Sequence, residues 1–313
     1  MTLKDHKLST PFPQLPEPGR FRIAVNTHAW KETTNNELSR ALALLDETEE
    51  TRILKYRALS DQKQSLIGRL ILNAMCCHTL NLPNSSLIWH RTDRNKPYLD
   101  ASILHSSSPA YDTNNFTYNV SHSGHWVVGA SELSYPIGID VSDHGIRPSC
   151  RLDYNLDPES DFNENLPVVA KHLKNFDSIF SNTEKLAMKR IRMSSSENQM
   201  IEFSRFWTSK ESYVKTEGLG LNLDVSRLAF DFSSIPNDRL PTLPSTLSPV
   251  PITVSLDNTD ESADWSFEQF ILDQNHLCTV AVNTQKRDFP QSTPLFVVQP
   301  SQLIHFLETF HGR

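Results

Sequence analysis

A chain of 313 residues with a formal net charge of −7 is long enough to form two compact domains with buried cores. The negative charge argues against nucleic acid as a partner, because phosphate backbones bind to basic surfaces. The four cysteines have no C-x-x-C spacing, which argues against a zinc site and fits reduced thiols. No stretch has the apolar length of a signal peptide or a membrane span, so we expect a cytoplasmic protein without membrane contact.

The first part of the chain predicts a strand, then helices, then more strands. Residues 1–20 are expected to be a flexible lead-in, and 21–30 alternate like a strand. Apolar residues recur every three to four positions over 35–56 and 60–80, which predicts two amphipathic helices against a sheet. A strand in 86–92 leads to a polar turn at Asp93–Lys96. Residues 116–143 then predict three strands, with a turn at Ser121–Gly124 and a link at Glu132–Pro136.

The second part contains polar inserts around 144–166 and 236–251, both rich in residues that disfavour regular structure. Helices are expected at 167–176, at 181–193 with a capping box of Ser181 and Glu184, and at the segment FWTSKESYVKTEGLGL (206–221), with Gly218 as its C-terminal cap. Two strands over 266–283 close the pattern.

Strands and helices therefore occur in a similar order on both sides of residues 132–136. We predict an α+β fold of two pseudo-equivalent halves, residues 21–133 and 134–313.

The helix in 206–221 combines aromatic and charged residues on one side. Trp207, Glu211 and Lys215 recur at intervals of four, so they share a face. One interpretation is a surface ion pair, worth about 0.3 to 0.5 kcal/mol. The other is a carboxylate held beside a cation at the edge of a cleft, with the aromatic side chains anchoring the helix.

Two further segments carry polar residues next to apolar strands. Asp140, in IGIDVSD, is expected at the end of a strand, where it could display a catalytic carboxylate or cap the following turn. Ser121 and His122, in NVSHSGHW, are expected in a tight turn to which Gly124 gives its unusual backbone angle. A Ser/His hydrolase is disfavoured because no G-x-S-x-G motif is present, and a structural turn histidine is the commoner interpretation. The chain also lacks G-x-G-x-x-G and P-loop motifs.

Taken in order, RNKPYL, YNVSHSG, IGIDVSD and FWTSKESYVKTEGLGL resemble the 4′-phosphopantetheinyl transferases, in particular the larger, monomeric surfactin-synthetase-activator type in a eukaryotic, fungal-like form. The resemblance implies a pseudo-twofold duplication of two α+β halves, each an antiparallel sheet packed with helices, with the active site between them. It implies a Mg²⁺-dependent transfer of phosphopantetheine from coenzyme A to a carrier-protein serine, which releases adenosine 3′,5′-bisphosphate.

The resemblance also assigns roles to residues. Asp140 and Glu211 would bind the metal, Glu211 would also be the general base, and Lys215 would stabilise charge on the pyrophosphate. The positions that would bind coenzyme A are Arg52, Arg91, Lys96, Ser121, His122, Asp140 and Lys210. The carrier could belong to a fatty-acid, polyketide or nonribosomal-peptide synthase, or to an aminoadipate reductase.

One departure from the family pattern affects the metal site. Bacterial members have Asp-x-Glu where this chain has Asp140, Val141 and Ser142, so a third carboxylate is missing and water or a polar side chain would replace it. Asp143 is one residue out of register and would point the other way on a strand. The alternatives are a non-catalytic module that binds coenzyme A or a carrier protein, and a generic metal-dependent phosphohydrolase, which would be expected to show further Asp or His ligands.

Overall fold

The computed structural model describes residues 19–30, 35–93, 95–106, 116–133, 135–144, 176–191, 195–218, 220, 223–232, 252–256, 259–260, 264–285 and 293–311. The predicted lead-in up to residue 18, the insert over 236–251 and nearly all of the segments 144–166 and 167–176 lie outside these residues. No helix in the described ranges has the length and apolar character to cross a membrane.

Contacts divide the chain into two compact units, which are described separately. The first comprises Met1–Tyr118, His125–Ser134 and Leu295–Arg313, and the second comprises Asn119–Gly124 and Tyr135–Pro294. This division differs from the halves expected from the sequence, because the C-terminal segment packs in the first unit. Its strand pairs with the first strand of the chain, a contact that local sequence patterns do not report.

The first unit contains one mixed sheet, one hairpin and five α-helices within the described residues. Its strands are β1 (Phe21–Asn26), β2 (Trp89–Arg91), β3 (Pro97–Leu99), β5 (Trp126–Glu132) and β12 (Phe296–Val298). Its helices are α1 (Asn35–Leu42), α2 (Glu47–Leu54), α3 (Leu59–Leu80), α4 (Ala101–Ser106) and α8 (Pro300–His311), with 3-10 helices at Thr27–Ala29 and Asn84–Ser86.

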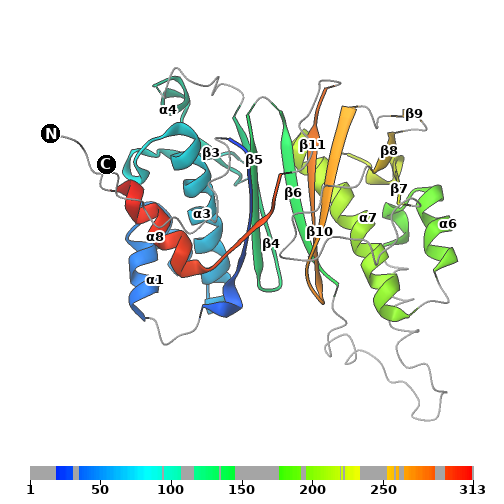
Figure 1. Ribbon diagram of the computed structural model, residues 1–313, viewed down its shortest axis with the longest axis horizontal. Helices are drawn as coiled ribbons and strands as arrows, with labels where there is room; N and C mark the ends of the chain where they lie inside the picture. The colour runs from blue at the N-terminus through cyan, green and yellow to red at the C-terminus, as the bar shows by residue number, and fades with distance from the viewer. Residues whose placement is uncertain are drawn as a thin grey trace, which may run out of the picture. The chain divides into compact units, whose positions relative to one another are not determined.

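The main sheet of this unit has β1 in its interior. β1 pairs antiparallel with β5 and parallel with β12, so the prediction of a purely antiparallel sheet is wrong here. Parallel neighbours need a long connection, and β12 reaches β1 only after the chain has passed through the second unit. Helix α3 packs against β1 and β5 and also against α8, as Figure 1 shows.

The helices of the first unit follow the predicted segments with two differences. The single helix expected over 35–56 is two: α1 ends at Leu42, and α2 begins after Asp46, which caps it by accepting a hydrogen bond from the Glu49 amide at 2.9 Å. Helix α3 is buried on nearly all sides from Leu66 to Leu80 rather than along one stripe, because other helices cover the side that does not face the sheet.

The second unit contains two antiparallel sheets within the described residues. One sheet has β6 (Ile137–Asp143), β10 (Trp265–Asp273) and β11 (His276–Asn283), and the other has β7 (Leu228–Asp231), β8 (Thr253–Leu256) and β9 (Thr259–Asp260). The later part of β4 (Thr117–Ser123), which pairs in the sheet β12-β1-β5-β4, also belongs to this unit. Its helices are α6 (Asn182–Arg190) and α7 (Ser196–Glu217), with 3-10 helices at Asp177–Ile179 and Val225–Arg227.

Helix α7 crosses the sheet β10-β11-β6 and covers one face of it (Figure 1). An aromatic core fills the space between them, including Phe206, Tyr213 and Trp265. The predicted helix ends are confirmed: Gly218 caps α7 in the left-handed region at φ +68°, and Ser181 and Glu184 form the capping box of α6.

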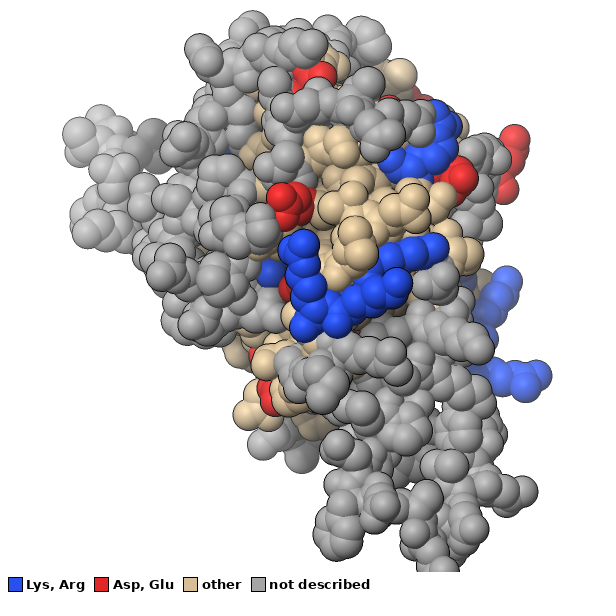
Figure 2. Space-filling view, turned by 90° about the vertical axis from the view of Figure 1, so that its right-hand side faces the viewer, with Lys and Arg blue, Asp and Glu red and all other residues tan. Residues whose placement is uncertain are grey.

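Helix α6 also contributes to the surface of the second unit. Leu186, Lys189 and Arg190 are exposed on it. Figure 2 looks at the molecule from the right-hand side of Figure 1, where α6 lies, and shows Lys and Arg side chains bordering an area of neutral residues in the described part of that face.

Candidate active site

Close packing between α7 and β6 places the charged side chains of the two elements together. A β-carbon on Gly138 would lie 2.2 Å from the backbone oxygen of Ser212 and 2.6 Å from the hydroxyl of Thr216. Only hydrogen fits between these atoms, so Gly138 sets how closely the helix approaches the strand. The hydroxyls of Thr208 and Thr279 are 2.6 Å apart and join α7 to the neighbouring strand β11.

Lys215 and Asp140 form an ion pair at this contact. The Lys215 ammonium lies 2.6 Å from Asp140 Oδ1 and also donates hydrogen bonds to Ser121 Oγ at 2.9 Å and to the Ile139 carbonyl at 3.2 Å. Ser121 Oγ donates in turn to Asp140 Oδ1 at 2.9 Å. Three residues that are far apart in the sequence therefore form one polar cluster. Asp140 lies within β6 rather than at its end, and its side chain is buried.

Alternate side chains of β4 bind β6. Asn119 Oδ1 accepts a hydrogen bond from the Ile139 amide at 3.1 Å, and Ser123 Oγ accepts one from the Asp143 amide at 3.1 Å. The predicted turn at Ser121–Gly124 is therefore wrong: residues 121–123 are strand, and the turn is Gly124–His125. The polar spacing i, i+2, i+4 in NVSHS could have shown that these side chains share a face.

Glu211 faces the same pocket, one turn of α7 before Lys215. The pocket has a volume of about 390 Å³ and is lined by Val120, Ser121, His122, Asp140, Val141, Trp207, Glu211 and Lys215. Burial and the nearby charge of Asp140 raise the pKa of Glu211, while Lys215 opposes the shift. The Glu211 carboxylate makes no hydrogen bond to another described residue, so it is available to a ligand or a proton.

Trp207 anchors this part of α7, as the sequence suggested. Its ring lies 5.6 Å from that of Phe176 and stacks on Phe203 at 6.4 Å. The helix is thereby fixed to the core of the second unit directly before the charged residues.

Lys210 does not belong to this cluster. Its ammonium is buried, lies 2.9 Å from Glu184 Oε2 and donates hydrogen bonds to the carbonyls of Val225 and Leu228. The prediction that Lys210 binds coenzyme A is therefore corrected to a structural role. Adjacent helix positions do not face each other, so Lys210 and Glu211 point in different directions.

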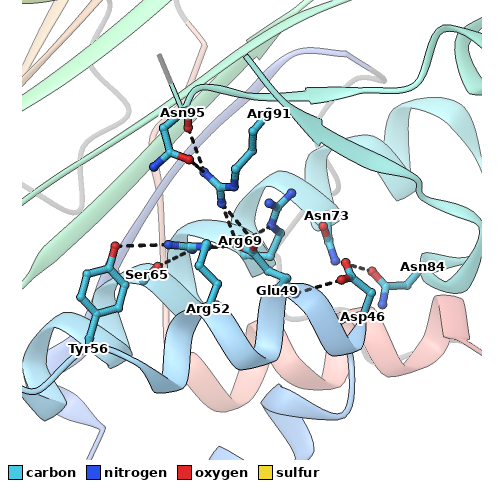
Figure 3. A network of polar contacts seen from close by, with 10 residues as sticks. All are labelled: Asp46, Glu49, Arg52, Tyr56, Ser65, Arg69, Asn73, Asn84, Arg91 and Asn95. Atoms are coloured by element: carbon cyan, nitrogen blue, oxygen red, sulfur yellow. Dashed lines mark hydrogen bonds and ion pairs between the residues drawn. The ribbon is translucent and has the colours of Figure 1, made fainter. Parts of the chain in front are cut away.

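Arg52, Arg91 and Lys96 all lie in the first unit, where two of them join a second polar cluster (Figure 3). The Glu49 carboxylate lies among three guanidinium groups, those of Arg52, Arg69 and Arg91, at distances of 2.8 to 3.1 Å. Lys96 is exposed, and its backbone forms the turn of the β2–β3 hairpin with Thr92. Sequence reasoning missed Glu49 and Arg69, because neither stands in a recognised motif.

The carboxylates of the pocket in the second unit have the chemistry of a magnesium site. Asp140 and Glu211 both line it, and carboxylate oxygens are the ligands that Mg²⁺ prefers. Asp140 Oδ2 and both Glu211 oxygens make no hydrogen bond to a described side chain, which leaves them for a cation. Ser142 lies on the same side of β6 as Asp140, where the third family carboxylate would be. Asp143 approaches His276 instead, with 3.8 Å between Oδ2 and Nε2.

Two carboxylates and one ammonium around a small pocket define a site suited to a metal ion, a phosphate group and a proton transfer, which are the requirements of phosphoryl-group transfer. Comparison with protein families gives the particular class. Residues 28–134 match the family model described as "4'-phosphopantetheinyl transferase, N-terminal", and residues 136–281 match the one described as "4'-phosphopantetheinyl transferase superfamily". The chain belongs to the 4′-phosphopantetheinyl transferase superfamily, and the resemblance seen in its motifs is confirmed.

Curated proteins agree with this assignment. The chain is 28% identical to the L-aminoadipate-semialdehyde dehydrogenase-phosphopantetheinyl transferase of Rattus norvegicus, over 77% of this chain and 68% of the rat protein. It is 27% identical to the protein of the same name from Homo sapiens, over 81% of this chain and 72% of the human protein. It is 25% identical to the 4'-phosphopantetheinyl transferase gsp of Aneurinibacillus migulanus, over 57% of this chain and 58% of the bacterial protein.

Proposed function

We propose that this enzyme transfers 4′-phosphopantetheine from coenzyme A to a serine hydroxyl of an acyl or peptidyl carrier domain and releases adenosine 3′,5′-bisphosphate. Membership of the superfamily supports the transfer reaction. The observation that carries the assignment of residues is the single pocket in which Asp140, Lys215, Ser121 and Glu211 meet.

The chemistry follows from the charges of that pocket. The carrier serine oxygen forms a bond to the phosphorus that bears pantetheine, and the bond from that phosphorus to the bridging oxygen of the pyrophosphate breaks. The serine proton passes to the Glu211 carboxylate, whose raised pKa makes it a stronger base than an exposed glutamate. Lys215 stabilises negative charge on the departing phosphate.

Asp140 and Glu211 would hold the metal ion. When bound, Mg²⁺ supplies positive charge that neutralises the pyrophosphate oxygens. A polar group or water at Ser142 would replace the missing carboxylate, which Mg²⁺ tolerates because it commonly keeps several water ligands.

The names of the mammalian relatives indicate one candidate partner. The names of those proteins join L-aminoadipate-semialdehyde dehydrogenase to phosphopantetheinyl transferase. We therefore propose the carrier domain of an aminoadipate reductase as a substrate, with fatty-acid, polyketide and nonribosomal-peptide synthase carriers as further candidates. We also propose that the two halves of the chain arose by duplication, that the enzyme acts as a monomer in the cytoplasm, and that Arg52, Arg91, Lys96 and His122 bind coenzyme A.

The test is incubation of the protein with coenzyme A, Mg²⁺ and an apo carrier domain, followed by mass spectrometry of the carrier. We expect a mass increase equal to one phosphopantetheine group, and loss of that increase when the carrier serine is replaced by alanine. Binding of coenzyme A with an unmodified carrier would instead identify a non-catalytic binding module. Release of adenosine 3′,5′-bisphosphate from coenzyme A without carrier modification would identify a phosphohydrolase.

A further inference from the structure

The cluster around Glu49 in the first unit contains more positive than negative charge. Glu49 is the single carboxylate among three guanidinium groups, so two positive charges remain after pairing. Its side chain is 7% exposed, and all of its hydrogen bonds in the described structure go to arginines. The carboxylate therefore joins three cations that would otherwise repel one another.

The three arginines differ in their access to solvent. The Arg69 side chain is 4% exposed and lies over the Trp89 ring, with 4.6 Å from Cζ to the ring centroid, so it is part of the core. The side chains of Arg52 and Arg91 are each 27% exposed, so both reach solvent and can meet a ligand.

Each of these two arginines is fixed by Glu49 and by further partners. Arg52 binds both Glu49 oxygens, at 3.0 and 2.8 Å, and donates to Ser65 Oγ at 2.7 Å and to the Tyr56 hydroxyl at 3.2 Å. Arg91 also binds both Glu49 oxygens, at 3.0 and 3.1 Å, and donates to the Asn95 carbonyl at 2.9 Å. Figure 3 shows both guanidiniums converging on Glu49 from different elements, α2 and β2. Two flexible cationic side chains are thus held close together before any ligand arrives.

The carboxylate of Glu49 does not have the capping role that its position in α2 would suggest. Glu49 is the third residue of the helix after the N-cap Asp46, the position where a glutamate often binds back to the N-cap amide. Here its backbone amide donates to Asp46, while its carboxylate binds the arginines.

We infer that Glu49 is a positioning residue for the reaction: it holds Arg52 and Arg91 as a preformed pair that receives a phosphate group of coenzyme A. The inference rests on the proposed binding of coenzyme A by these two arginines. Preorganisation lowers the entropic cost of binding, so loss of Glu49 should weaken the binding of coenzyme A and leave the chemical step, which uses the second unit, unchanged.

The test is Glu49→Gln, which keeps the shape and removes the charge. We expect the KM for coenzyme A to rise by about tenfold or more, as when a misplaced arginine loses one charge-assisted hydrogen bond to the phosphate, with kcat within about threefold of the unaltered enzyme. Glu49→Asp keeps the charge and should restore part of the affinity. Glu47→Gln is the matched control, because Glu47 is an exposed residue of the same helix, and its KM should not change.

If Glu49 only stabilised the fold, Glu49→Gln would change kcat rather than the KM. Partial unfolding of Glu49→Gln lowers the concentration of active enzyme and thus the apparent kcat, while the KM of the folded fraction stays the same. A KM within twofold of the unaltered value, or equal losses in Glu49→Gln and Glu47→Gln, would overturn the inference.

A double-mutant cycle separates this inference from the function on which it rests. In an Arg52→Ala/Arg91→Ala background, Glu49→Gln should raise the KM no further; a full additional increase would overturn the inference. If the double arginine variant has a normal KM, the assignment of these arginines to coenzyme A is wrong, and the inference is lost with it. Calorimetric titration with adenosine 3′,5′-bisphosphate gives the same comparison without carrier modification, and Glu49→Gln should bind this probe about tenfold more weakly.

Discussion

The two polar clusters of this protein have opposite charge balances. In the first unit, three arginines surround the one carboxylate of Glu49. In the second, the carboxylates of Asp140 and Glu211 share a pocket with the one ammonium of Lys215. The first cluster suits an anion, and the second suits a cation and a proton. An enzyme that acts on a pyrophosphate ester needs a site for the anion and a site for a cation and a proton. The comparison shows that the excess charge of a cluster, rather than any one residue, determines which ligand the cluster suits.

The largest effect is expected in the second unit, from Glu211→Gln. An amide can neither accept the serine proton nor supply charge to a metal ion, so carrier modification should fall at least about a hundredfold, the lower end of general-base effects. Coenzyme A should still bind, because the arginine cluster is unchanged. Carrier mass and calorimetry measure the two properties.

Glu197→Gln is the control for that change, because Glu197 is an exposed residue of the same helix. It should modify the carrier at the normal rate. Near-normal activity of Glu211→Gln would show that Glu211 is neither the general base nor an essential ligand of the metal ion.

The Glu49 cluster should make the first unit sensitive to acid. Burial alone would raise the pKa of Glu49, but its hydrogen bonds and the charges of Arg52 and Arg69 outweigh burial and lower the pKa to about 2. The ionised group therefore contributes about 3 kcal/mol to the free energy of unfolding, fully present above about pH 4.5 and lost as the pH falls towards 2. Urea unfolding at several pH values measures it.

Glu49→Gln provides the comparison for that measurement. The difference in unfolding free energy between the unaltered protein and Glu49→Gln should shrink as the pH falls from about 5 to 2, while Glu47→Gln follows the unaltered protein. A difference that stays constant with pH would show that Glu49 is not held ionised by the arginines.

Asp140→Asn should have a smaller effect that metal can reverse. Asparagine keeps an oxygen but loses the charge that attracts Mg²⁺, so we expect about a tenfold loss of activity at low Mg²⁺ and partial recovery at high Mg²⁺. Transfer rates across a Mg²⁺ series measure this effect. Glu211→Gln should not recover in the same series, and a recovery in both variants would remove the distinction between a metal ligand and a base.

Local signals in the sequence predicted the elements on which the second cluster is built. The apolar run before Asp140 predicted β6, and Gly218 predicted the end of α7. The four-residue spacing of Glu211 and Lys215 predicted that they share a face, and both line the pocket. These features depend on residues a few positions apart, which is the range over which helix and strand periodicity operates.

Features that depend on distant residues were not predicted. Two of the three arginines that bind Glu49, Arg69 and Arg91, come from other segments, and the parallel pairing of β12 with β1 joins strands from the first and last parts of the chain. The burial of Lys210 depends on Glu184, on another helix. A sequence pattern shows which face a residue occupies but not which element covers that face, so these contacts needed the structure.

The smallest expected effect concerns salt and the first cluster. The two excess positive charges of the arginine cluster should attract anionic coenzyme A over a distance that shrinks from about 30 Å at 0.01 M salt to about 8 Å at 0.15 M. The KM for coenzyme A should therefore rise about threefold between these two salt concentrations in the unaltered enzyme and much less in Arg52→Ala/Arg91→Ala. Lys189→Ala removes an exposed cation from α6 and should keep the full salt dependence. Steady-state kinetics at constant Mg²⁺ measures all three. Equal slopes in the unaltered enzyme and the double arginine variant would mean that the cationic excess of the first unit does not act on this substrate, and the contrast between the clusters would then rest on the acidic pocket alone.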